Sequence, residues 1–267
     1  MWRKKRSFVG LSSIHYGSPV TAPFARRLLG WRNPRGRSRP VPNCADSDSD
    51  ASVRIAAGML EALELEPQEA IAREPGPELE RLVRDDIRSA LAESAPHRHW
   101  EVDRGKVISH FAQYAHLQRV DELVRTNAEL RITIGQDYLI KPDVTVGLVD
   151  FDVLGADPFL HAAVSCKWTI RSDRVQNIRH ECNQMIRHRR GRQPHLIAVT
   201  AEPLPSRLVS IARGTGEVDA VYHIAFDALQ HSVEHHATPQ QQEAWQECVE
   251  QRRLLSYANL ADTLTRW

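Results

Sequence analysis

Two apolar runs joined by a short turn constrain the fold of this 267-residue chain more than any other feature. The runs are YLIKPDVTVGLV at 138–149 and LHAAVSCKWTI at 160–170, with GADP between them. β-Branched residues bounded by turn residues are typical of the strands of a hairpin. The segment SDRVQNIRHECNQMIRHRRG at 172–191 follows, with its apolar residues on one stripe and Gly191 as the expected stop. The sequence therefore predicts a hairpin followed by an amphipathic helix.

Helical and strand patterns alternate along the rest of the chain. Helices are expected over 53–65, 77–91, 108–127 and 226–236, strands over 194–202 and 219–224, and a short helix between these strands. Strands interleaved with helices predict an α/β fold, with a mixed central sheet flanked by helices on both faces.

The composition excludes several classes of protein. Hydrophobic residues at 42% and charged residues at 26% are near the average for globular proteins. No stretch approaches the ~18 consecutive apolar residues of a membrane span, so no membrane partner is expected. The four cysteines form no CxxC pair, which argues against structural zinc and a redox dithiol. We expect a reduced, cytoplasmic protein.

Charge is distributed unevenly along the chain. Residues 1–45 contain ten lysines and arginines and no acid, while the remainder contains all 34 acidic residues and 25 basic ones. A targeting peptide, a phosphate-binding arm and an over-extended start are the alternatives for this segment. Glycine and proline interrupt its uncharged middle, which disfavours a signal peptide. We predict a flexible basic arm over 1–42 and a single domain over 43–267.

Each strand of the predicted hairpin carries a charged residue, Asp143 or Lys167, in apolar surroundings. Burying a charge is costly unless it is paired or coordinated. Alternate strand residues share a face, so Ser165 lies beside Lys167, and Cys166 points to the other face as inert filling. On the following helix, Glu181 lies on the side that faces the sheet. Two carboxylates and a lysine are thus expected to converge.

This set suits phosphodiester hydrolysis, which needs oxygen ligands for a hard cation and positive charge near the developing oxyanion. Asp143 and Glu181 supply the oxygens, and Lys167 orients the attacking water or stabilises the phosphorane charge. Glu80, at the border of the apolar face of its helix, is a candidate for a second metal. The alternative is a buried Asp–Lys salt bridge with an unrelated surface glutamate.

The motifs in this region resemble a known nuclease family. Pro142-Asp143 followed by Ser165-Cys166-Lys167 is similar to the PD-(D/E)xK signature with its third acid displaced. The run SCKWTIRSDRVQNIRHE resembles the NgoMIV-type type II restriction endonucleases, in which the second metal carboxylate comes from the helix. Further matching pieces are CAD, GPELE, QYAHL, DYLIKPD, VTAEPLPSR and ARGTGEVDAVYH, so the likeness covers 44–233.

The resemblance implies a restriction-endonuclease-like core, Mg²⁺ dependence with two ions per active site, and cleavage of double-stranded DNA within GCCGGC, leaving 5′ overhangs. It also implies a homodimer that assembles into a homotetramer. The metal ligands would be Asp143, Glu181 and Glu80, with Lys167 and Ser165 completing the catalytic set. The base readers would be Arg171, Asp173 and Arg174, with Arg207 and Asp46 for the outer pair. Arginine is the usual bidentate reader of guanine, and aspartate can accept from cytosine N4.

Two other readings of the function remain. A repair or junction nuclease would share the metal site and use RSDR as a phosphate clamp, whereas a non-catalytic DNA-binding protein would need no intact acid–lysine set. The cluster RHRRGR at 187–192 either grips phosphates or complements the dipole at a helix C-terminus. Trp168 and Tyr114 are expected to serve in packing. Extra acids beside Asp46, namely Asp48 and Asp50, and the short connection from Asp143 to Lys167 depart from the family pattern.

Overall fold

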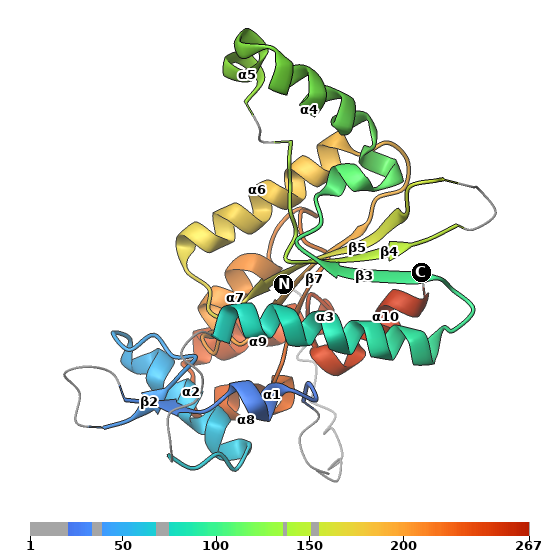
Figure 1. Cartoon of the computed structure of the whole chain (residues 1–267). Helices are drawn as coiled ribbons and strands as arrows, with labels where there is room; N and C mark the ends of the chain where they lie inside the picture. Colours follow the sequence, from blue (N-terminus) through green and yellow to red (C-terminus); the bar gives the residue numbers. More distant parts are fainter. Residues whose placement is uncertain (1–20, 34–38, 68–74, 136–137, 151–154, 267) are drawn as a thin grey trace, which may run out of the picture.

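A six-stranded mixed sheet forms the centre of the molecule (Figure 1). The computed structural model describes residues 21–33, 39–67, 75–135, 138–150 and 155–266. The strands lie side by side in chain order: β3 (Trp100–Arg104), β4 (Val144–Leu148), β5 (Phe159–Lys167), β6 (His195–Thr200), β7 (Ala220–His223) and β8 (Leu254–Ser256). Neighbours from β3 to β5 are antiparallel and those from β5 to β8 are parallel. The predicted mixed sheet and the β4–β5 hairpin are confirmed.

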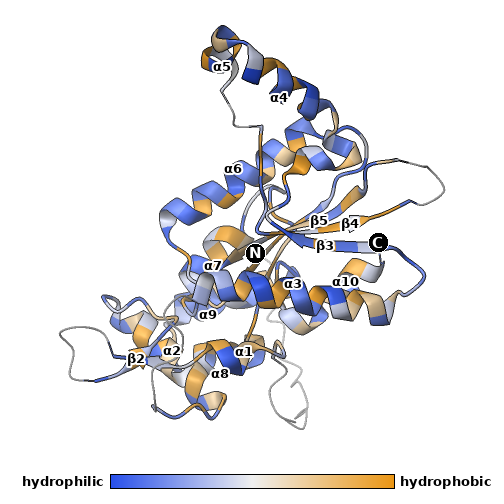
Figure 2. Cartoon of the chain, viewed as in Figure 1, coloured by the Kyte–Doolittle hydropathy of each residue, from blue (hydrophilic) through white to orange (hydrophobic). Residues whose placement is uncertain are grey.

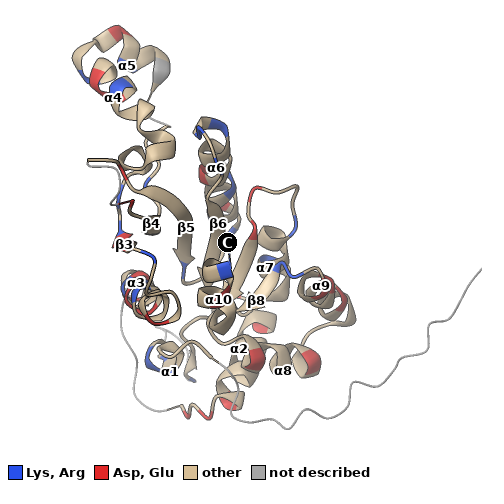
Figure 3. Ribbon diagram, turned by 90° about the vertical axis from the view of Figure 1, so that its right-hand side faces the viewer, with Lys and Arg blue, Asp and Glu red and all other residues tan. Residues whose placement is uncertain are grey.

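Helices cover both faces of this sheet. Helices α3 (Pro75–Ser94) and α10 (Leu260–Arg266) lie on one face, and α6 (Ser172–His188), α7 (Pro205–Ala212) and α9 (Pro239–Glu250) lie on the other side (Figures 1 and 3). Helices α2 (Asp50–Ala62) and α8 (Phe226–His236) pack against each other at one end. Orange and blue alternate along the helices in Figure 2, as expected for amphipathic helices with one buried face.

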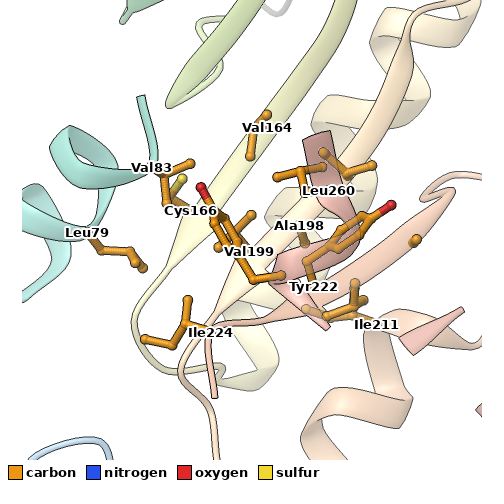
Figure 4. Close-up of a cluster of buried hydrophobic side chains, with 14 of the residues drawn as sticks. Leu79, Val83, Val164, Cys166, Ala198, Val199, Ile211, Tyr222, Ile224 and Leu260 are labelled. Atoms are coloured by element: carbon orange, nitrogen blue, oxygen red, sulfur yellow. The ribbon is translucent and has the colours of Figure 1, made fainter. Parts of the chain in front are cut away.

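The core side chains come from both layers. Leu79 and Val83 of α3 approach Cys166 of β5, and Tyr222 and Leu260 lie further along the same cluster (Figure 4). Burial of apolar side chains contributes about 25 cal/mol per Å² of area removed from water, so this shared cluster is what holds α3 on the sheet. Trp168 and Tyr114, expected to serve in packing, are 7% and 0% exposed.

The structure corrects three expectations about the elements. The helix expected over 108–127 is two 3-10 turns, η1 (Ile108–His110) and η2 (Ala112–Tyr114), followed by α4 (His116–Thr126). Phe111 lies between the turns with an extended backbone (ψ 145°), which interrupts any continuous helix. Helix α6 ends at His188, before Gly191, because Arg189 is already extended (ψ 148°). Helix α5 (Ala128–Ile134) and strands β3 and β8 were not expected.

The predicted N-terminal arm also needs correction. Residues 21–33 and 39–42 are packed against the body and contain α1 (Ala25–Leu28), β1 (Trp31–Arg32) and β2 (Val41–Pro42). Phe24 and Leu28 are buried, and the Ala22 amide donates to the Ile224 carbonyl at 2.8 Å. Apolar residues interleaved with the arginines anchor this stretch, so the fold begins before residue 43. Residues 1–20 lie outside the described part.

Helices α4 and α5 project away from the sheet (Figures 1 and 3). They carry two exposed large apolar side chains, Leu123 and Ile132, which are 45% and 87% exposed. Among the described residues, no helix is both long and apolar enough to span a membrane.

Candidate active site

The β4–β5 hairpin places Asp143 against the C-terminal end of β5. Asp143 directly precedes β4, whose first residue, Val144, pairs with Val164. One carboxylate oxygen of Asp143, Oδ2, accepts the Cys166 amide proton at 2.7 Å and a proton of Lys167 Nζ at 2.7 Å. The Asp143 and Lys167 side chains are 20% and 26% exposed, so the pair lies at the edge of the core with access to solvent.

Glu181 approaches this pair from α6. Ile178 and Cys182 are buried against the sheet, which leaves Glu181 partly exposed beside them. Burial raises the pKa of the Glu181 carboxyl; Lys167 opposes this effect, and the negative charge of Asp143 adds to it. For Lys167, burial alone would lower the pKa, but the attraction of Asp143 and Glu181 outweighs it and raises the pKa of the ammonium group. The Glu181 carboxyl therefore interacts electrostatically with the Asp143–Lys167 pair.

The alternation of β5 separates a polar face from an apolar one. Ser165 and Lys167 share a face, and Ser165 is 5% exposed. Cys166 points to the opposite face, toward α3, and burial raises the pKa of its thiol well above the usual range. A thiol that remains protonated in the core is a poor nucleophile, which agrees with the expected filling role.

Glu80 reaches the site from α3, on the other side of β5 from Glu181. Its carboxylate Oε2 accepts from Arg104 Nη2 of β3 at 2.6 Å. Glu80 lines a cavity of about 370 Å³ together with Asp143, Arg104 and Lys141. It also lines a cavity of about 510 Å³ with Lys167. Arg104 had gone unnoticed because its strand was not expected.

The donors present fit a hard divalent cation. Asp143 and Glu181 offer carboxylate oxygens from two elements, and Mg²⁺ is usually held by one or two carboxylates while it keeps several waters. In the described part of the chain, no three or more His, Cys, Asp or Glu side chains form a group that could hold a metal. Glu80, paired with Arg104, is therefore not part of a three-carboxylate cluster in this conformation.

The predicted readers of the inner base pairs lie at the start of α6. Arg171 occupies the N-cap position of the helix with an extended backbone, and Asp173 lies in the first turn. Both are exposed, whereas Arg174 is partly buried and its Nη1 donates to the Thr169 carbonyl at 2.7 Å. Asp173 and Arg174 line the same cavity as Lys167, so these side chains border the catalytic set.

The two predicted readers of the outer base pair contact each other directly. Arg207 Nη2 of α7 donates to Asp46 Oδ2 in an ion pair whose side chains are 25% and 29% exposed. This hydrogen bond, with the Asp48 amide and the nearby Arg171 charge, holds the pKa of Asp46 below its usual value. The segment before Asp46 is fixed to the end of β5 because the Trp168 indole Nε1 donates to the Asn43 carbonyl at 3.2 Å.

Sequence reasoning missed Glu202, a carboxylate that lies between the two reader groups. Glu202 is 0% exposed, and its oxygens accept from the Ile170 amide at 2.7 Å and the Leu204 amide at 3.1 Å. Arg207 Nη1 lies 3.6 Å from Glu202 Oε2. Burial raises the pKa of Glu202, and these three partners oppose that effect. A charged residue inside the apolar run 194–202 is the signal that points to it, by the same argument that identified Asp143.

Comparisons with known proteins agree with this geometry. The profile of the family described as NgoMIV restriction enzyme matches residues 31–151 and 152–264. The type II restriction enzyme NgoMIV of Neisseria gonorrhoeae is 36% identical over 239 residues, which is 78% of this chain and 84% of the relative. The chain belongs to the NgoMIV restriction enzyme family. The expected family and enzyme class, a type II site-specific deoxyribonuclease with a restriction-endonuclease-like core, are confirmed.

A weaker likeness links this NgoMIV-family enzyme to a solved structure, the pre-specific complex of restriction endonuclease BsaWI with DNA. The TM-score is 0.32 and the identity 13%, with 67% of this chain and 65% of that chain covered. A likeness at this level carries no argument of its own. The family match alone disfavours a repair nuclease and a non-catalytic DNA-binding protein.

Proposed function

We propose that this enzyme hydrolyses double-stranded DNA within GCCGGC, leaving 5′ overhangs, in a Mg²⁺-dependent reaction with two ions per active site. The observation that carries the proposal is the Asp143–Lys167 pair with Glu181 beside it, together with Asp173 and Arg174 on the wall of the cavity that Lys167 also lines. The similarity to NgoMIV supports the same specificity, and arginine and aspartate readers suit a site made only of G and C. We also propose that the enzyme acts in the cytoplasm, because its proposed substrate is DNA.

Asp143 and Glu181 would hold the cation, which supplies Lewis acidity and lowers the pKa of bound water. Lys167 donates a hydrogen bond to Asp143, and its ammonium group would orient the attacking water or stabilise the negative charge that develops on the attacked phosphate. Ser165 lies on the same strand face, where its hydroxyl supports the catalytic set. Glu80 would become a further metal ligand if its ion pair with Arg104 broke and its carboxylate bound the cation instead. No covalent intermediate with the protein is needed.

Recognition divides between two surfaces. Arg171, Asp173 and Arg174 read the inner base pairs from the start of α6, and Arg207 with Asp46 reads the outer pair. Because GCCGGC is palindromic, one active site per strand requires a two-fold dimer. We further propose that two dimers join into a homotetramer.

The test is digestion of otherwise identical plasmids with and without one GCCGGC sequence. We expect cleavage of the first plasmid in Mg²⁺ and of neither in EDTA. Sequencing of the ends determines the bond cut. Equal cutting of both plasmids would contradict the proposed specificity and favour a non-specific nuclease.

A further inference from the structure

Glu202 lies in the β6–α7 loop and contacts both reader surfaces through one carboxylate. Its Oε2 accepts from the amide of Ile170, the residue before Arg171. Its Oε1 accepts from the amide of Leu204, which caps α7, the helix that carries Arg207. The same Oε2 lies 3.6 Å from Arg207 Nη1. The inner and outer readers are therefore joined through a single side chain.

A role in stability alone does not explain a charge at this position. A carboxylate with no exposed area has a desolvation cost of several kcal/mol, and replacing a buried ion pair by apolar residues is often neutral or stabilising. Base-reading side chains, in contrast, must be held within about 0.5 Å of their productive geometry. Glu202 accepts from the Ile170 amide, next to the RSDR segment, and it contacts the guanidinium of Arg207. A side chain with these two contacts can hold both groups of proposed readers in position.

We propose that Glu202 is a positioning residue that sets base-pair specificity by fixing the RSDR segment and Arg207 relative to each other. The proposal rests on the proposed reading of GCCGGC and extends it to a residue that touches no base. Arg207 has Asp46 as its second partner, so its guanidinium is oriented from two sides. The Ile170 amide, buried beside Glu202, has its acceptor in this carboxylate.

The test compares Glu202→Gln with the wild type on three duplexes: GCCGGC, ACCGGT with the outer pair changed, and GCTAGC with the central pair changed. Glutamine removes the charge facing Arg207. It also replaces one of the two carboxylate oxygens, each of which accepts from a different backbone amide, with an NH2 group that can only donate. We expect the preference for GCCGGC over both altered duplexes to fall by about tenfold or more, a change comparable with losing a good bidentate base contact. Arg207→Ala should relax the outer pair only.

Gln113→Ala is the matched control for a purely structural effect. Gln113 is 2% exposed, and its side chain also makes two backbone hydrogen bonds, to the Leu160 amide and carbonyl at 2.8 Å and 2.7 Å. Leu160 lies at the opposite end of β5 from Lys167. This variant should lower the Tm while leaving the preference unchanged.

The proposal would be overturned if Glu202→Gln kept the wild-type preference with a Tm loss like that of Gln113→Ala. Relaxed discrimination at the outer pair alone would also overturn it. If Glu202→Gln does not fold, Glu202→Asp, which keeps the charge with a shorter reach, takes its place. Failure of both variants to fold would overturn the proposal as well, because it would show that Glu202 is needed for the fold itself. A wild type that ignores GCCGGC contradicts the proposed specificity instead, and Glu202 is then tested on the site that the wild type cuts.

Discussion

At the scale of single residues, we predict that Glu181 is needed for cleavage and not for recognition. It lies beside Asp143 and Lys167, while the proposed readers Arg171 and Asp173 are exposed at the beginning of the same helix. Glu181→Ala should abolish cleavage because it removes a ligand oxygen, and specific binding in Ca²⁺ should remain because no base contact is lost. Cleavage and gel-shift assays on one GCCGGC duplex measure the two properties.

The control for this variant is Glu243→Ala, which removes an exposed carboxylate on α9 and should cut at the wild-type rate. A folded Glu181→Ala protein that cuts at nearly the wild-type rate would refute the displaced-acid mechanism. The search for the second ligand would then return to Glu80.

His223 gives a residue-scale prediction about pH. It is 0% exposed on β7, and burial lowers the pKa of its imidazole to about 4. In the unfolded chain the imidazole has a pKa of about 6.5. Between pH 6.5 and pH 4 the imidazole is therefore protonated in the unfolded state and neutral in the native state. The free energy of unfolding therefore falls as pH decreases from about 6.5 to 4, by about 3 kcal/mol from this group.

Urea unfolding at pH 7 and pH 4.5 measures the effect. His223→Gln should show a smaller stability difference between the two pH values than the wild type. His235→Gln, at an exposed position of α8, should show the wild-type difference. Equal differences in all three proteins would contradict the prediction.

At the scale of elements, α6 carries both proposed base readers and a proposed metal ligand. Its first turn carries Asp173, its middle carries Glu181, and a buried stripe that includes Ile178 fixes the whole helix on the sheet. We expect Arg171→Ala and Asp173→Ala each to weaken discrimination against GCTAGC by about 1 to 3 kcal/mol, the value of a good base contact. Competition cleavage of GCCGGC and GCTAGC duplexes gives the ratio.

Gln176→Ala, at an exposed position on the same helix, is the control and should keep the wild-type ratio. If Arg171→Ala and Asp173→Ala still cut only GCCGGC at an undiminished rate, RSDR is not the reader. Both interpretations of the basic C-terminal end of α6, phosphate binding and stabilisation of the helix dipole, remain open. Arg187 and His188 occupy the last turn, where the dipole also favours cations.

At the scale of the whole molecule, the proposed homotetramer binds two duplexes at once. Plasmids with two GCCGGC sites should therefore be cut faster than plasmids with one, because the second site is present at a high local concentration. Rates on the two plasmids, combined with the mass in solution from light scattering, check this. Equal rates with a dimeric mass would contradict the tetramer.

The sequence by itself determined the hairpin and several of the helices, and it supplied the prediction of the catalytic set. Asp143 and Lys167 could be predicted because burying a charge in an apolar strand is costly unless the charge is paired or coordinated. Glu181 could be predicted because helical periodicity fixes which side of the helix faces the sheet. Such local patterns depend only on neighbours along the chain. The roles proposed for the base-reading residues came from the resemblance to the family motif.

Only the tertiary structure decided what depends on segments far apart in the chain. It packed residues 21–33 into the body, and it paired Glu80 with Arg104, a residue of an unexpected strand. It also placed Glu202 between Ile170 and Arg207. The physical reason is that burial and hydrogen bonding of a polar group depend on which distant backbone reaches it, and no periodicity in the sequence records that.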